Sequence, residues 1–231
     1  MKILALEAST MAAGAAVADE DKLWGESFTD YKLKHSEKLL PMIHHLLEDL
    51  HLTMSEIDAV AVGKGPGSFT GLRIAAATAK SLVHARNLPL IPISSLEVCA
   101  APYAYFGGIV CPIFDAQRQQ VYTAMFKGGQ RLSPDSAVSI QELNAKLEAL
   151  EDAVLFTGDG LYKFTTYFRQ QLGSRAVIAR PGMDMPRAGA LARLAVSCYQ
   201  AGNYTDYQHY LPNYIRASQA EAHFKQHEPK D

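Results

Sequence analysis

The chain has 231 residues, of which 48% are hydrophobic and 20% charged, enough apolar material for one large domain or two of about 100 residues each. A formal net charge of −2 and a pI near 6.4 do not indicate the basic surface of a nucleic-acid-binding module. The cysteines are odd in number, far apart and without a CxxC pair, which indicates free thiols in a reducing compartment. Met1 leads directly into a strand pattern and no apolar run approaches the roughly 20 residues of a membrane span, so we expect a cytoplasmic protein.

The first 104 residues follow a regular order of predicted elements. Three short apolar or alternating segments come first and are predicted to be antiparallel strands. A helix, a strand and a second helix follow, which gives the order βββαβα, and a further strand ends this half. The predicted strands span 3–7, 13–18, 23–28, 57–62 and 89–93, and the predicted helices span 35–50 and 70–85.

The second half of the chain restarts this pattern. Strands are predicted at 109–114, 120–126, 153–156 and 176–179, and helices at 139–150, 161–172 and 187–200. From Ala217 the chain is polar, and we expect it to be frayed or held only by a partner. We therefore predict an α/β protein of two lobes, 1–104 and 105–231, with the βββαβα order that actin, Hsp70, sugar kinases and ribonuclease-H-like proteins share (the ASKHA fold).

A glycine-rich loop connects the central strand of the first half to the second helix. Two interpretations are open: an anion site at the positive end of a helix, or a tight turn from strand to helix. The loop is not a Walker A motif, because Ser68-Phe69-Thr70 follows the last glycine. Nucleotide-binding proteins of this fold carry a glycine in the first hairpin, where this chain has Ala8, so an intact phosphate loop is not expected. The loop residues are Gly63, Gly65, Pro66, Gly67 and Ser68, and Ser68 or Thr70 can cap the helix.

Both helices of the first half carry unusual faces. The apolar sector of helix 35–50 spans about 160°, wider than the roughly 100° of a helix with one buried face, so we expect a second contact beyond the sheet. Helix 70–85 is rich in alanine, which either its own sheet or a partner helix would explain. We predict that Leu39→Glu or Ala76→Glu weakens binding to a partner while the monomer still folds. The predicted interface residues are His35, Leu39, Met42, Ile43, Leu46, Leu47, Leu72, Ala75, Ala76 and Ala79.

Residue patterns for catalysis or metal binding are weak. No Gly-x-Ser-x-Gly elbow is present, and no cysteine has neighbours that would lower its pKa. His44 and His45 point about 100° apart on a helix, so we expect that they cannot share a metal. His223 and His227 have i,i+4 spacing but no third ligand nearby. We expect no catalytic residue and no bound metal.

The run 60–97 resembles the TsaB (YeaZ) family of bacterial tRNA-modification proteins. The similarity extends to the opening strand, to His35-Ser36-Glu37 and to Asp115-Ala116 with Val121-Tyr122. Gln117 departs from the family, which commonly has arginine at this position, and Arg118 follows it. The similarity also covers Pro212, Tyr214, Arg216 and Glu221 near the end of the chain.

The resemblance implies a subunit without chemistry of its own. TsaB-like proteins are similar to TsaD, the catalytic subunit that makes N6-threonylcarbamoyladenosine in tRNA. TsaD follows its Gly-Pro-Gly stretch with a metal-binding His-x-x-x-His, and these positions correspond here to Ser95 and Cys99. The resemblance therefore implies a non-catalytic subunit that binds a TsaD-like partner, with a TsaE-like ATPase in the assembly and tRNA held mostly by the partner. It also implies a homodimer through the same surface without that partner, and ATP or ADP only within the complex.

Two other classes of function stay open at this point. A stand-alone ATP- or metal-dependent enzyme, a kinase or a peptidase, would need phosphate bound at 65–67 and a metal site. The Glu7-Ala8-Ser9 turn and the residues Ser95 and Cys99 disfavour this class. A direct tRNA-binding module would need its lysine and arginine side chains to cluster in space.

Overall fold

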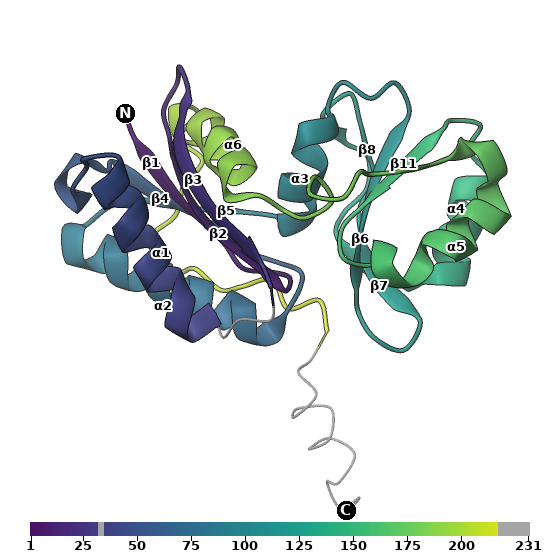
Figure 1. The fold of residues 1–231 in the computed structure, drawn as a ribbon, viewed down its shortest axis with the longest axis horizontal. Coiled ribbons are helices and arrows are strands. Elements are labelled where there is room, and N and C mark those ends of the chain that lie inside the picture. The colour runs from purple at the N-terminus through teal and green to yellow at the C-terminus, as the bar shows by residue number, and fades with distance from the viewer. Residues whose placement is uncertain (32–34, 217–231) are drawn as a thin grey trace, which may run out of the picture.

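The computed structural model describes residues 1–31 and 35–216, which form two α/β lobes side by side (Figure 1). The sheet of the first lobe has the order β3-β2-β1-β4-β5. β1 pairs antiparallel with β2 and parallel with β4, as the predicted order requires. Its strands are β1 (Ile3–Glu7), β2 (Ala12–Ala18), β3 (Leu23–Asp30), β4 (Ala59–Gly63) and β5 (Leu90–Ile93).

Helices cover both faces of the first sheet. α1 (His35–Asp49) and α2 (Phe69–Arg86) lie on one face and α6 (Ala188–Gln200) lies on the other (Figure 1). In β1, Leu4 and Leu6 point into the core under α1 and α2, whereas Ile3 and Ala5 point into the core under α6. Because both faces are covered, every residue of β1, β2 and β4 is buried, which explains their continuous apolar sequences.

The second lobe repeats the strand order of the first. Its path is β10-β7-β6-β11-β12, so β6 takes the central place that β1 has in the first lobe. This confirms the predicted fold, and it adds the strand β10 and the β8–β9 hairpin, which were not predicted. The elements are β6 (Ile109–Asp115), β7 (Gln120–Thr123), β8 (Phe126–Lys127), β9 (Gln130–Arg131), β10 (Ser136–Ser139), α4 (Ile140–Glu148), β11 (Val154–Thr157), α5 (Leu161–Leu172) and β12 (Ala176–Ile178).

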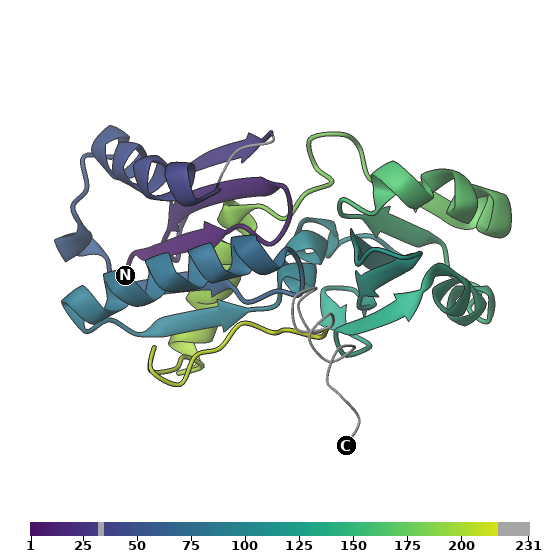
Figure 2. The same cartoon turned by 90° about the horizontal axis from the view of Figure 1, so that it is seen from below.

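The end of the chain returns to the first lobe. α6 packs its alanine and leucine side chains on the first sheet, and Leu90 of β5 pairs with Thr205. Tyr210 is buried in the core under α1 and α2. Figure 2 shows the segment after α6 running along the first lobe towards the second. The predicted second lobe, 105–231, therefore includes a part, 188–216, that packs on the first, and the predicted tail from Ala217 lies outside the described residues.

Polar residues begin the helices where the sequence indicates. Ser68 Oγ accepts a hydrogen bond from the Gly71 amide, 3.3 Å away, at the start of α2. Ser139 and Glu142 form a reciprocal capping box at the start of α4. Within 1–31 and 35–216, no helix combines the length and the apolar character needed to cross a bilayer.

Candidate functional site

The glycine-rich loop between β4 and α2 lies directly on the turn that joins β1 to β2. A Cβ atom at Gly67 would lie 2.1 Å from the Ser9 carbonyl oxygen, and one at Gly63 would lie 2.1 Å from a carboxyl oxygen of Glu7. The Ser68 amide donates a hydrogen bond of 2.6 Å to the same Ser9 oxygen. The glycines therefore allow close approach of the loop to the protein's own hairpin.

Glu7 fills the space beneath this loop. Its carboxyl is 1% exposed and accepts hydrogen bonds from the Ser9 amide at 2.8 Å and from Ser95 Oγ at 3.1 Å. Burial raises the pKa of Glu7 above its ordinary value, while the hydrogen bonds from Ser9 and Ser95 act in the opposite direction. The Glu7 carboxyl is therefore held by donors of the protein itself.

The amides of the loop already have protein acceptors. The Lys64 amide donates to the Ile93 carbonyl at 2.8 Å, and the Gly65 amide donates to Ser95 Oγ at 3.3 Å. With the Ser68–Ser9 hydrogen bond, these contacts use amides that an anion site would need. Of the two interpretations of the loop, the geometry favours the tight turn.

We expect that Gly67→Ala destabilises the protein by at least about 2 kcal/mol, because the new methyl group meets backbone of the β1–β2 turn rather than a movable side chain. Urea unfolding followed by circular dichroism measures the change. Gly107→Ala is the matched control, since no atom lies within 4 Å of a Cβ at that position. Equal stability of the two variants would contradict the close fit between loop and hairpin.

Ser95 and Cys99, which the resemblance predicts to stand at the TsaD metal-ligand positions, lie one turn apart on α3 (Ser95–Ala100), and both are buried. Ser95 Oγ donates to Glu7. Cys99 Sγ lies 3.5 Å from Thr157 Oγ1 and donates to the Asp184 carbonyl at 3.7 Å. Burial raises the pKa of Cys99, so its thiol stays protonated at neutral pH. Neither side chain is free to hold a metal in this arrangement.

An acidic residue ends the central strand of each lobe. Asp115 is the last residue of β6, as Glu7 is the last residue of β1. Each carboxylate accepts a hydrogen bond from the backbone amide two residues further along the chain. For Asp115 this donor is the Gln117 amide, at 3.0 Å. Asp159, which the sequence analysis did not single out, accepts the Asp115 amide at 3.0 Å. Burial raises the pKa of Asp159 to about 6, and the nearby carboxylates of Asp115 and Asp30 act in the same direction.

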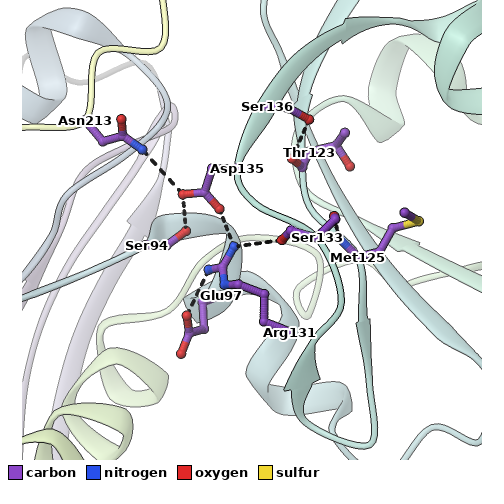
Figure 3. A network of polar contacts seen from close by, with 9 residues as sticks. All are labelled: Ser94, Glu97, Thr123, Met125, Arg131, Ser133, Asp135, Ser136 and Asn213. Carbon is purple, nitrogen blue, oxygen red and sulfur yellow. Dashed lines mark hydrogen bonds and ion pairs between the residues drawn. The ribbon is translucent and has the colours of Figure 1, made fainter.

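A polar network connects the lobes (Figure 3). It lies beside a cavity of about 400 Å³. The Arg131 guanidinium donates to Glu97 at 2.8 Å and to Asp135 at 2.5 Å. Asp135 also accepts from Ser94 Oγ at 2.8 Å and from the Asn213 amide group at 3.5 Å. The network joins the hairpin of the second lobe, α3 and the segment after α6.

The segment 212–216 runs from the glycine loop to the second lobe. The Asn213 amide donates to the Lys64 carbonyl at 2.7 Å, and the Tyr214 ring lies 4.8 Å from the Phe69 ring. Arg216 donates to the Ala116 carbonyl, next to Asp115. These contacts explain why a Pro-x-Tyr-x-Arg pattern stands near the end of the chain.

The predicted interface residues lie mostly inside the protein. Leu39 is 1% exposed and Ala76 is 7% exposed, so neither is a surface position and the expectation that Leu39→Glu leaves the fold intact is contradicted. Met42 is half-buried, and the side chain of His35 lies outside the described residues. Whether α1 and α2 bind a partner stays a prediction. The other buried members of the predicted set are Ile43, Leu46, Leu47, Leu72, Ala75 and Ala79.

The outer side of α1 and α2 does expose some apolar surface. Leu40, which was not in the predicted set, is 57% exposed. Met42 and Ile74 are half-buried, and Ala77 is exposed. A partner that docks on these helices would therefore meet a different set of side chains from the predicted one.

Comparison with known proteins agrees with this geometry. The family of the tRNA N6-adenosine threonylcarbamoyltransferase TsaD matches residues 29–224. The tRNA threonylcarbamoyladenosine biosynthesis protein TsaB of Bacillus subtilis is 34% identical over 226 residues, which are 96% of this chain and 97% of that protein. The crystal structure of YeaZ from Pseudomonas aeruginosa has a TM-score of 0.76 at 26% identity and covers 92% of this chain and 99% of its own.

A more distant likeness supports the fold alone. The activator of 2-hydroxyisocaproyl-CoA dehydratase from Clostridium difficile, solved with bound ADPNP, has a TM-score of 0.53 at 9% identity. The match covers 87% of this chain and 97% of the activator.

Proposed function

The chain belongs to the TsaB family of tRNA threonylcarbamoyladenosine biosynthesis proteins, and from this premise we propose that it is a non-catalytic subunit that binds and activates a TsaD-like transferase. The observation that carries the proposal is the closed site on α3. Ser95 and Cys99, which the resemblance predicts to replace the metal-binding histidines of the transferase, both bond to the protein's own groups. A scaffold of the transferase fold without an open metal site suits a partner rather than an enzyme.

The proposed docking surface is the outer side of α1 and α2. Leu40 is largely exposed there, and Met42 and Ile74 add half-buried apolar area on the same two helices. Covering this area by a partner would contribute roughly 25 cal/mol per Å² of apolar surface, less the cost of ordering both surfaces. In the absence of the transferase the same surface would pair two copies of this chain. A TsaE-like ATPase joins the proposed complex, and any nucleotide enters with the complex.

We expect threonylcarbamoyl transfer to tRNA by the TsaD-like partner, its ATPase and the AMP-forming synthase to require this chain. The double variant Ser95→Ala with Cys99→Ala should retain most of that activity, because the proposal gives neither side chain a chemical role. The measurement is threonylcarbamoyladenosine formed per tRNA with and without the chain. Both substitutions remove buried hydrogen bonds, so co-elution of the variant with the partner is the control for folding and assembly.

Transfer that proceeds equally well without the chain would contradict the proposal. Activity lost in the double variant, while the complex still assembles, would instead show that Ser95 and Cys99 take part in chemistry. Zinc and ATP binding by the isolated double variant would then locate that chemistry.

A further inference from the structure

α1 presents three metal-ligating side chains at one place on its solvent-exposed side. His44 Nδ1 lies 3.0 Å from Glu48 Oε2, and His45 Nδ1 lies 3.4 Å from the same oxygen. The ligand atoms of all three side chains lie within 4.8 Å of one another. The side chains are between 61% and 75% exposed, so an ion from solution would reach them directly.

The two separations between a histidine nitrogen and the Glu48 oxygen are close to those of neighbouring ligands on one transition-metal ion. Zinc bonds of 2.0–2.1 Å in a tetrahedral site place neighbouring ligand atoms roughly 3.3 Å apart. His44 and His45 diverge around the helix and were predicted not to share a metal, yet both rings approach the same Glu48 oxygen. Glu48 lies at i+4 from one ring and at i+3 from the other, so both rings turn towards the same carboxylate.

The charge around the cluster favours a cation. Glu48 and Asp49 form the acidic end of α1, and its last turn has no basic residue. The carbonyl end of a helix carries a partial negative charge, so acidic side chains there are unfavourable unless a cation is close. A bound divalent ion would offset the negative charge of the carboxylates and the partial negative charge of the helix end.

We propose that His44, His45 and Glu48 form a surface site for a first-row divalent transition metal, with Zn²⁺ as the probe ion. Two neutral imidazoles and one carboxylate supply three ligands, and water completes the coordination sphere. The proposal does not depend on the proposed function. The alternative is a metal-free cluster in which both imidazole rings hydrogen-bond to Glu48. Such exposed contacts between histidine and glutamate contribute little to the stability of the fold.

The experiment is a titration of the full chain with Zn²⁺ in competition with a chromophoric chelator. All variants carry His223→Gln and His227→Gln. These two substitutions remove a second pair of histidines, which are spaced at i,i+4 in the sequence. We expect one bound zinc per chain, with affinity lowered at least about tenfold by Glu48→Gln and by His44→Gln, because loss of even an outer-shell partner costs a metal site 10-fold or more. His51→Asn, which removes an exposed histidine just beyond α1, is the matched control and should not change the affinity.

Ring-proton NMR spectra identify the ligands independently of the variants. Zinc should shift the signals of His44 and His45 and leave that of His51 in place. The proposal is overturned if the background protein takes up no zinc, or if Glu48→Gln and His44→Gln bind it as tightly as the background does. Since all three side chains are exposed, we expect every variant to keep the circular dichroism spectrum of the wild type.

Discussion

Replacing Leu39 by glutamate should unfold the protein. The Leu39 side chain is 1% exposed and packs in the same core as Ile43 and Tyr210. The substitution gives up about 1.5–3 kcal/mol of apolar burial, and it also places a carboxyl group without a partner in that core, at a further cost of several kcal/mol. The sum approaches the whole stability of a typical domain, about 5–15 kcal/mol.

Thermal unfolding followed by circular dichroism measures this loss. A destabilisation of about 4 kcal/mol corresponds to a fall in Tm of roughly 10 °C for a protein of this size. The neighbouring substitution Leu40→Glu is the matched control, because Leu40 is 57% exposed and its Tm should stay close to that of the wild type. A Leu39→Glu variant that melts within a few degrees of the wild type would contradict the position of α1 on its sheet.

The fold of the first lobe could be predicted because its central strands are continuous apolar runs. β1 and β4 are buried at every residue, and their sequences show it directly. β10 was missed because its four residues are half-buried and polar at both ends, and α3 because its six residues complete fewer than two turns. Short elements such as these are positioned by the lobes around them rather than by their own pattern.

Periodicity identified the buried side of α1 but not what covers it. The wide apolar sector of α1 is covered by the chain itself, through the first sheet and α2. α2 begins 20 residues after α1 ends, beyond β4. A wide apolar sector therefore indicates burial on two sides, and it cannot distinguish a partner from a distant part of the same chain.

The candidate site was predictable only where composition marks it. The glycines and Pro66 identify the loop, and Glu7 ends a strand that is plain in the sequence. The hydrogen bond from Ser95 to Glu7 beneath the loop joins residues 88 positions apart. The contacts that link Asp135 to Ser94 and Asn213 join residues 41 and 78 positions apart. No local pattern predicts such pairs, because the geometry that creates them is that of the folded lobes.

Leu40→Glu should separate partner binding from folding. Leu40 projects from the exposed side of α1, so a partner docked there would enclose the new carboxylate without a compensating charge. We expect affinity for the TsaD-like partner to fall at least about tenfold, equivalent to 1.4 kcal/mol or more. Titration of the labelled partner measures the affinity.

Leu132→Glu is the matched control for this binding experiment, because Leu132 is 55% exposed but lies in the second lobe. Its affinity for the partner should stay at the wild-type value, as should the Tm of both variants. Sedimentation of each variant alone tests the self-association proposed for the same surface, which Leu40→Glu should weaken as well. If Leu40→Glu bound the partner as tightly as Leu132→Glu, the docking surface would lie away from α1, while the proposed role in threonylcarbamoyl transfer would still rest on the reconstituted reaction.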